Sequence, residues 1–395
     1  MRRLPPRVSA LTQRALRAAR SFRLPRRVVR ALAFFAVFSL VAYFGFWQRF
    51  LQPRLREARL LDASLRDAEG ALDSGTGYRY WGWNVRPHFS DMVYVQKLED
   101  KYNPTTAAGA TNKRLVVIGD VHGCKSELVK LLDKLSFDSS RDHLVLAGDL
   151  VSKGPDSAGV IDFARNVGAS CVRGNHDDRV LLAHKSLVAQ GHLTPPGDDG
   201  AEPPKDRRGD QQAGAPPGAD WDMDDPHGPN ASLDSDRAHS VARALTAQQL
   251  GWLASCPVIL DAGNVQGMGK LAVVHAGLVP GVPLERQDPF LCMNMRTIDL
   301  ETRLPSEDRR GSPWERIWNH YQRKQMPSQR STVVYGHDAK RGLNIQAYSK
   351  GLDSGCVRGG RLTALVLEAG KPGADVTESY VDVPCDNYVK KASGS

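Results

Sequence analysis

The sequence predicts an α/β sandwich domain that follows a single N-terminal transmembrane helix. Three observations predict this arrangement. Residues 31–51 are largely apolar and follow an arginine-rich terminus, apolar runs alternate with helical stretches from Arg114 onward, and the second half of the chain is rich in short strands. The chain has 395 residues and a hydrophobic content of 41%, which is ordinary for a protein with a packed core.

The positive charge of the chain is concentrated at its N-terminus. The formal net charge is +9, and residues 1–30 contain ten arginines with no Asp or Glu. The rest of the chain is close to neutral, since +9 less these ten charges leaves −1. A nearly neutral remainder does not indicate a broad basic surface. We therefore expect a cytoplasmic arginine-rich arm over residues 1–30 and no nucleic-acid partner.

An apolar segment follows this arm directly. Ala31 to Trp47 contains no charged residue, and extension to Leu51 makes the segment long enough to cross a bilayer. Because the flank richer in arginine stays in the cytoplasm, we expect a signal anchor over residues 31–51 with the remainder on the lumenal or outer side. This predicts a single-pass type II protein of the vacuolar or another secretory-pathway membrane. An arginine-rich mitochondrial presequence is the alternative.

Residues 52–110 are expected to form a charged helical stalk and a linker, and residues 111–390 a folded domain. The first half of this domain shows the alternation of βαβ units. In chain order, the expected elements are strand 114–120, helix 125–135, strand 143–149, helix 157–168 and strand 169–174. A helix capped by Thr246 and Gln249 should run to Leu253. Further strands are expected at 257–262, 271–277, 331–337, 343–348 and 361–368.

Residues 191–237 interrupt this pattern. They are rich in Pro, Gly and Asp and contain few aliphatic residues, which predicts a disordered surface insertion. The insertion includes Asn230-Ala231-Ser232. This tripeptide is an N-glycosylation sequon, and it lies on the side predicted to be lumenal.

The six cysteines show no paired spacing such as C-x-x-C, so a zinc–thiolate module is not supported. A lumenal compartment would permit disulfides. Cys124 and Cys171 lie beside polar loops, and we expect them to be small packing residues. Cys292 with Cys385 is then the pair to test as a disulfide.

Five of the expected strands end in polar clusters. In α/β sheets, ligands gather at the carboxyl ends of strands, so we expect these ends to meet at one place. The polar residues are, in chain order, Asp120 and His122, Asp149 and Lys153, Arg173, Asn175 and His176, His275, and His337.

Six of these side chains can hold two divalent metal ions. Two metals about 3.5–4 Å apart need one bridging carboxylate and a separate ligand set for each ion. We expect Asp120 and His122 on one metal. Asn175, His275 and His337 are expected on the other metal, with Asp149 bound to both. Imidazole with carboxylate suits zinc, manganese, cobalt or iron rather than calcium. The expected ligands are Asp120, His122, Asp149, Asn175, His275 and His337.

The motifs GDVHG, GDLVSKGP, GNHD, HAG and YGH occur in this order. They resemble the motifs of the phosphoprotein-phosphatase type of calcineurin-like metallophosphoesterases. The resemblance covers roughly Arg114 to Ala369 without the insertion. It implies an αββα fold, a metal-bridging hydroxide as nucleophile, and His176 as general acid to the leaving oxygen.

Departures from the family pattern indicate the branch. Ser152 and Lys153 stand where the eukaryotic serine/threonine phosphatases of this family carry an acid and an arginine, which leaves open whether Asp177 or a backbone carbonyl orients His176. KGP and GLDSGCVRGGRLTAL resemble instead the bacterial-type branch that includes diadenosine tetraphosphatases. The anchor and the polar insertion are similar to those of fungal vacuolar zinc-dependent endopolyphosphatases.

This resemblance implies a metal-dependent hydrolase of phosphoanhydride bonds, with inorganic polyphosphate as the expected substrate and zinc as the favoured metal. Lys153 and Arg173 should neutralise oxygens of the attacked phosphate, and Arg296 is a further candidate phosphate clamp. A phosphoprotein or a dinucleoside polyphosphate is the alternative substrate. A membrane scaffold that retains the fold without activity is the alternative of another class, although such a chain would be expected to have lost a ligand.

Overall fold

The computed structural model describes residues 25–69, 84, 86–87, 92–105, 113–193, 231–370 and 374–391. The chain divides into two compact units, residues 1–63 and 64–395. Most of the predicted arginine-rich arm lies outside the described residues, and so do residues 194–230 of the predicted insertion, including Asn230.

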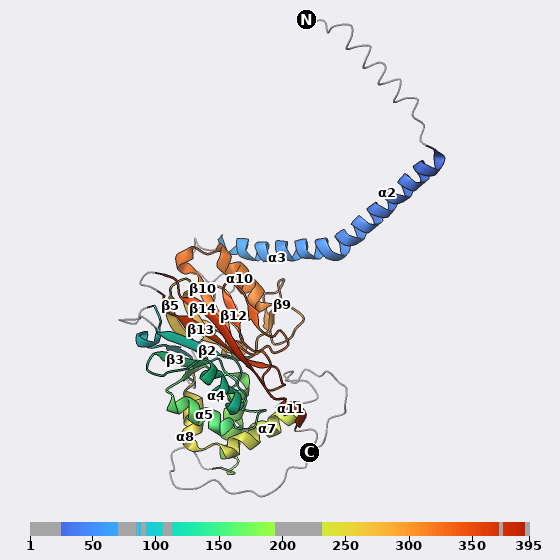
Figure 1. Cartoon of the computed structure of the whole chain (residues 1–395). Helices are drawn as coiled ribbons and strands as arrows, with labels where there is room; N and C mark the ends of the chain where they lie inside the picture. Colours follow the sequence, from blue (N-terminus) through green and yellow to red (C-terminus); the bar gives the residue numbers. More distant parts are fainter. Residues whose placement is uncertain are drawn as a thin grey trace. The chain divides into compact units, whose positions relative to one another are not determined.

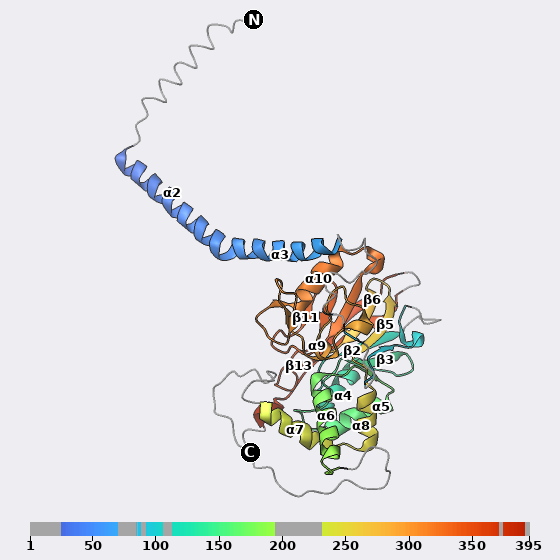
Figure 2. The same ribbon diagram turned by 180° about the vertical axis from the view of Figure 1, so that it is seen from behind.

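The first unit is built around helix α2 (Arg26–Phe46), a π-helical turn η1 (Trp47–Leu51) and the start of α3 (Gln52–Glu69). The apolar side chains of α2 are exposed, and none of its residues is buried. Figures 1 and 2 show the chain changing direction between α2 and α3, where the π-helical turn lies. By length and composition this helix could cross a membrane, although a signal sequence has the same properties.

The second unit contains two large sheets. One has the strand order β14-β13-β2-β3-β4, the other β1-β5-β6-β10-β12-β11, and a small sheet has the order β8-β7-β9. The strands of the first sheet are β2 (Arg114–Ile118), β3 (Asp142–Leu146), β4 (Ser170–Cys171), β13 (Arg361–Glu368) and β14 (Thr377–Pro384). Those of the second are β1 (Val95–Lys97), β5 (Ile259–Val265), β6 (Gly269–Val274), β10 (Ser331–Tyr335), β11 (Asn344–Ile345) and β12 (Ser349–Gly351). The small sheet consists of β7 (Thr297–Ile298), β8 (Pro305–Ser306) and β9 (Ser312–Pro313).

The central strands β2 and β3 of the five-stranded sheet are buried on both faces. In β2, Leu115 and Val117 belong to an apolar cluster shared with the six-stranded sheet, whereas Val116 and Ile118 belong to a cluster shared with helices. This division follows from the two-residue period of a strand, which turns alternate side chains to opposite faces. A strand with apolar residues at every position is therefore typical of a sheet between two layers.

Helices cover the outer faces of the two sheets. The apolar cluster on the outer face of the five-stranded sheet includes residues of α4 (Lys125–Lys134), α5 (Ser157–Asn166), α6 (Asn175–Ala189), α7 (Ala231–Ala244) and α8 (Ala247–Ser255). Figures 1 and 2 show α4 and α5 beside the end of the domain that carries β2 and β3. On the other side, Trp314 of α10 (Trp314–Lys324) packs against Tyr335 of β10, with ring centroids 4.9 Å apart. The layer order is αββα, as predicted.

The predicted strands are present, and the predicted helix after Thr246 is capped by Thr246 and Gln249. The expected strand 343–348 is shorter, since β11 covers Asn344–Ile345. The end predicted for the disordered insertion was wrong, because residues from Ala231 onward form α7. Strands β1, β7, β8, β9, β12 and β14 were not predicted from the sequence. Two further short helices are α9 (Pro289–Asn294) and α11 (Tyr388–Lys391).

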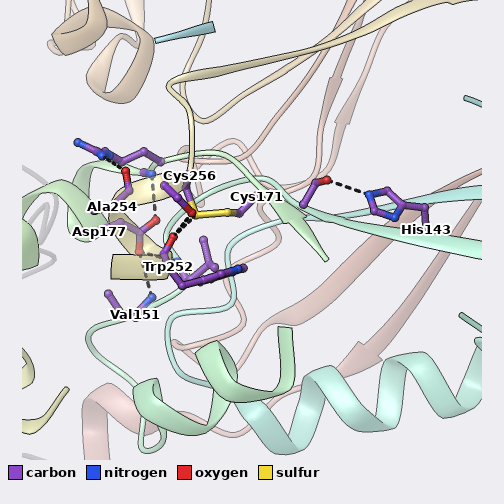
Figure 3. Close-up of a disulfide and its surroundings, with 12 residues drawn as sticks. His143, Val151, Cys171, Asp177, Trp252, Ala254 and Cys256 are labelled. Atoms are coloured by element: carbon purple, nitrogen blue, oxygen red, sulfur yellow. Dashed lines mark hydrogen bonds between the residues drawn. A yellow bond between two sulfur atoms is a disulfide. The ribbon is translucent and has the colours of Figure 1, made fainter. Parts of the chain in front are cut away.

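The disulfides differ from those expected. Cys171 bonds to Cys256, with Cα atoms 5.2 Å apart, and Cys356 bonds to Cys385. The pairing of Cys292 with Cys385 was therefore wrong, as was the view of Cys171 as a packing residue only, whereas Cys124 is buried and free as predicted. The reason is tertiary: Cys171 ends β4 and Cys256 precedes β5 (Figure 3), and spacing along the chain does not reveal their proximity.

Candidate metal centre and substrate cleft

The ends of strands from both large sheets meet at one buried site. β2, β3 and β4 of one sheet and β6 and β10 of the other each end shortly before a predicted ligand. The pairings β2–β3, β3–β4 and β6–β10 are parallel, so the ends lie at the same edge of each sheet. Ligand atoms of Asp120, Asp149 and His275 lie within 4.8 Å of one another, and all three residues are buried.

Hydrogen bonds from the backbone hold the strand-end loops together. The His122 N–H donates to the Asp149 carbonyl oxygen, 2.7 Å away. The His337 N–H donates to Asp120 Oδ1 at 3.0 Å, and the His176 N–H donates to Asp149 Oδ1 at 2.9 Å. Each carboxylate is thus fixed by the backbone of another loop, which positions the side chains before any ligand binds.

Positive φ angles of non-glycine residues concentrate at this site. The values are 48° at His122, 50° at Asp149, 75° at Ser152, 63° at Lys153 and 71° at His337. Such backbone conformations are unfavourable for residues with a Cβ and persist only where the surroundings hold them. The hydrogen bonds between the loops provide that support.

At two positions of the site, glycine is required because a Cβ atom would collide with a neighbouring carboxylate, and not because the backbone turns there. A Cβ atom added to Gly336 would collide with Asp120 Oδ1, and one added to Gly174 would collide with Asp149 Oδ1. Neither glycine has a positive φ angle. The absence of a side chain at these two positions lets the backbone approach the carboxylates closely.

Three imidazole rings of the site each direct one nitrogen at a backbone carbonyl oxygen. A carbonyl oxygen only accepts hydrogen bonds, so this nitrogen carries the hydrogen. The other ring nitrogen then has a lone pair that can bind a metal ion. Metal-binding histidines typically show this pattern. The three pairs are His122 Nδ1 with Val151 O at 3.3 Å, His275 Nδ1 with Ala147 O at 3.0 Å, and His337 Nε2 with Asn294 O at 3.0 Å.

The other nitrogen of His275 meets two ligand-type oxygens. Its Nε2 atom lies 3.0 Å from Asn175 Oδ1 and 3.4 Å from Asp149 Oδ1. Burial alone lowers the pKa of His275, but the charges of Asp149 and Asp120 outweigh it and raise the pKa to about 10. The carboxylates around His275 therefore stabilise a positive charge beside its Nε2 atom. A divalent cation fits the same set of donor atoms.

The two carboxylates differ in their electrostatic surroundings. Burial raises the pKa of Asp120, and the charge of Asp353 raises it further. Burial also acts to raise the pKa of Asp149, but the neighbouring imidazoles, led by His275, hold it well below the usual range. Asp149 thus lies at the centre of the histidine cluster, where His122 Nε2 is 3.5 Å from its Oδ2 atom.

Asp177 has a role that the sequence analysis did not predict. It is fully buried, its Oδ1 atom accepts the N–H groups of Leu150 and Val151 at 2.9 and 3.2 Å, and its Oδ2 atom accepts the N–H of Gly174 at 2.9 Å. Figure 3 shows Asp177 and Val151 near the Cys171–Cys256 disulfide. Asp177 therefore joins the loop of Asp149 to the start of α6. An acid in the first turn of a helix was the available signal.

A small cleft reaches this centre. Lys153 points its ammonium group toward the ligands, since its Nζ atom lies 3.5 Å from His122 Nε2. The loop between β12 and β13, which carries the motif GLDSGCVRGGRLTAL, lines the cleft as well. The lining residues are Asp120, His122, Asp149, Lys153, His337, Ala339, Asp353, Gly355, Cys356, Val357 and Arg358.

Arg173 and Arg296, predicted to bind substrate, are not among the described residues that line this cleft. Arg173 is 6% exposed and donates to the Ala254 carbonyl oxygen at 2.7 Å and to Asp178 at 3.3 Å. Arg296 is 3% exposed and donates to the Glu307 carbonyl oxygen at 3.2 Å. The structure thus joins all six predicted ligands, Lys153 and His176 in one place, and gives these two arginines partners within the protein.

Comparison with known proteins identifies the class. The family model described as calcineurin-like phosphoesterase matches residues 113–342. The match covers more than half of the chain, so this chain belongs to the calcineurin-like phosphoesterase family. It is a metal-dependent phosphoesterase, as the resemblance of its motifs implied.

Individual relatives fall into two groups. The chain is 27% identical over 291 residues to the zinc-dependent endopolyphosphatase of Saccharomyces cerevisiae, covering 69% of this chain and 82% of that protein. It is 29% identical over 273 residues to the symmetrical bis(5'-nucleosyl)-tetraphosphatase of Vibrio parahaemolyticus, covering 64% of this chain and 94% of that protein. A crystal structure assigned to a diadenosine tetraphosphatase superposes with a TM-score of 0.50 at 29% identity, covering 75% of this chain and 99% of that one.

Proposed function

We propose that this chain hydrolyses phosphoanhydride bonds of inorganic polyphosphate at a pair of divalent metal ions, with zinc as the favoured metal. The observation that carries the proposal is the convergence of His275 Nε2, Asn175 Oδ1 and Asp149 Oδ1 beside the buried Asp120. The similarity to an endopolyphosphatase over 82% of that protein's length supports the substrate.

The six predicted ligands would hold the metal ions, which when bound would polarise the phosphoryl group and acidify a water molecule. Asp149 is the proposed bridging carboxylate. His176 is buried with its ring centroid 5.1 Å from that of His122, and we assign it to donate a proton to the leaving oxygen, which typically contributes roughly 10² to 10⁴ in rate. The Lys153 ammonium would bind an oxygen of the attacked phosphoryl group.

Dinucleoside polyphosphates are the second candidate substrate. The chain aligns with 94% of a symmetrical bis(5'-nucleosyl)-tetraphosphatase at 29% identity, which supports this alternative at similar strength in sequence. Both substrates contain a chain of phosphoryl groups joined by anhydride bonds, so the same ligands and the same general acid would serve for either.

We also propose that residues 31–51 anchor the chain as a single-pass type II protein, with the catalytic domain on the lumenal side of a vacuolar or other secretory membrane. The length and apolar composition of α2 support the anchor. The disulfides Cys171–Cys256 and Cys356–Cys385 support an oxidising compartment for the domain. Protease added to intact membrane vesicles from expressing cells should leave the domain uncut, and digestion without detergent would contradict this orientation.

The activity can be tested with the full chain purified in detergent. Long-chain polyphosphate would be incubated with zinc, manganese, cobalt or magnesium, and the products resolved on a gel beside an Asp149→Asn variant. Chains of intermediate length that are absent with the variant would support endopolyphosphatase activity, whereas loss from the ends alone would support exopolyphosphatase activity. Intact polyphosphate with every metal, together with cleavage of a dinucleoside tetraphosphate, would favour the second candidate.

A further inference from the structure

One wall of the cleft is formed by the loop between β12 and β13. Gly355, Cys356, Val357 and Arg358 line the cleft together with the candidate metal ligands. Arg358 is the cationic residue of this wall, beside Gly355, Cys356 and Val357. This residue was not singled out by the sequence analysis, because a loop arginine gives no sign of which residues it faces.

The backbone of this loop is held on two sides. Within the loop, the N–H groups of Arg358 and Gly360 both donate to the Gly355 carbonyl oxygen at 3.0 Å. From the C-terminal segment, the Cys385 N–H donates to the Gly360 carbonyl oxygen, also at 3.0 Å, and the Cys356–Cys385 disulfide adds a covalent link. The position of Arg358 is therefore set by the fold rather than by a mobile surface loop.

The charges that line the cleft explain what an arginine at this place can do. Asp120, Asp149 and Asp353 are acids, and an anionic substrate must approach them. Among the described lining residues, Lys153 and Arg358 are the two with permanently cationic side chains. Lys153 lies against the ligand His122, so it is placed for the attacked phosphoryl group. Arg358, on the wall formed by the β12–β13 loop, is the second cationic residue that an anionic substrate would meet.

We propose that Arg358 binds the phosphoryl group next to the one under attack and thereby favours phosphoanhydrides over phosphate monoesters. The guanidinium group presents paired N–H donors that match two phosphate oxygens. A monoester has no second phosphoryl group and gains nothing from this contact. The inference rests on the proposed function, since it assumes that a phosphoanhydride is hydrolysed at this centre.

The test compares three variants of the full chain in detergent: Arg358→Met, Arg358→Lys and the control Arg361→Met. Arg361 is exposed on β13 three residues away, pairs with Asp382, and does not line the cleft. Kinetics would be measured with long-chain polyphosphate, a dinucleoside tetraphosphate and the monoester p-nitrophenyl phosphate. Melting temperatures of all variants would be recorded under the same conditions.

We expect Arg358→Met to lower kcat/KM on the phosphoanhydride by about 10- to 100-fold, mainly through KM, as for loss of a charge-assisted hydrogen bond. Activity on p-nitrophenyl phosphate should change by less than about twofold. Arg358→Lys should recover part of the loss, and Arg361→Met should match the unaltered chain on every substrate.

Two different failures can be told apart. An unaltered chain that cleaves p-nitrophenyl phosphate but neither phosphoanhydride would refute the proposed function and the inference with it. If phosphoanhydrides are cleaved but Arg358→Met has no effect, or lowers activity on all three substrates equally, only the role of Arg358 is refuted. A fall in melting temperature without substrate selectivity would mark Arg358 as a structural residue.

Discussion

The metal centre and the basic side chains around it are placed by different parts of the fold. Each candidate ligand follows a strand end, and hydrogen bonds between the loops fix the carboxylates. Lys153 lies on a turn with positive φ, Arg358 on a loop joined to the C-terminal segment, and Arg173 inside the protein. This difference suggests that chemistry, substrate preference and stability depend on separate residues, which substitutions can separate.

The largest effect is expected at the centre. Asp149→Asn keeps the size of the side chain and an oxygen for the His176 N–H, but it removes the charge that faces three histidines. We expect kcat to fall by about 10³-fold or more on every substrate, since the bridging ligand of the proposed metal pair is lost. Metal content measured by elemental analysis should fall with it. Asp133→Asn on the exposed side of α4 is the matched control.

Near-normal activity of Asp149→Asn with a full complement of metal would contradict the assignment of Asp149. The expected difference between the metal ligands and the basic residues around them would then be absent, because loss of a ligand charge would affect activity no more than loss of a basic side chain.

The ligand set could be predicted from the sequence because its members follow apolar strands at motif spacing. Asp120, Asp149 and His337 each come two or three residues after such a strand, and parallel strands bring their ends together. The contacts of Arg173 could not be predicted in this way. Its partners, Ala254 and Asp178, include a carbonyl oxygen from a helix remote in sequence.

The same reason accounts for the disulfides and for Arg358. Cys171 and Cys256 are 85 residues apart, and Cys356 and Cys385 are 29 apart, so only the packing of β4, β5 and the C-terminal segment reveals the pairs. Which arginine lines the cleft is likewise decided by contacts between loops. Local sequence pattern predicted the strands and the ligands at their ends. The disulfides and the place of Arg358 depend on contacts between loops that are distant in the sequence.

Two substitutions to methionine, each with an effect of intermediate size, compare a basic residue in the cleft with one inside the protein. Lys153→Met should lower kcat/KM by roughly 10- to 100-fold and leave the melting temperature nearly unchanged, because Lys153 is only half-buried and lines the cleft. Arg173→Met should lower the stability by about 1–3 kcal/mol, because the partly buried Ala254 carbonyl oxygen loses its donor and Asp178 its partner. The melting temperature should then fall by about 2–10 °C.

Kinetics and thermal unfolding of both variants would check this pair. Arg173→Met should retain most of its kcat/KM at a temperature where it is folded. A stable Arg173→Met protein with strongly reduced affinity for substrate would instead support the sequence-based prediction that Arg173 binds phosphate. Arg173 would then belong with the substrate-binding residues of the cleft and not with the residues that stabilise the fold.

The smallest effect concerns two buried histidines with opposite electrostatic surroundings. His275 faces carboxylates, whereas His143, near the start of β3, stacks on Tyr102 with ring centroids 3.6 Å apart and contacts Ser170 Oγ at 2.8 Å. Burial lowers the pKa of His143 to about 4. Since this value is below that of the unfolded chain, about 6.5, the unfolded state takes up the proton first as the pH falls. Stability is therefore present above pH 6.5 and is lost as the pH falls toward 4.

His143→Gln should reduce this acid sensitivity, because glutamine does not titrate and can still reach Ser170. The contribution of His143 between pH 7 and pH 4.5 is roughly 2–3 kcal/mol at most, so the fall in melting temperature over this range should be a few degrees smaller in the variant. An equal fall in His143→Gln and the unaltered chain would show that His143 accepts its proton in the folded state. Burial would then not be enough to make the titration of His143 differ from that of His275.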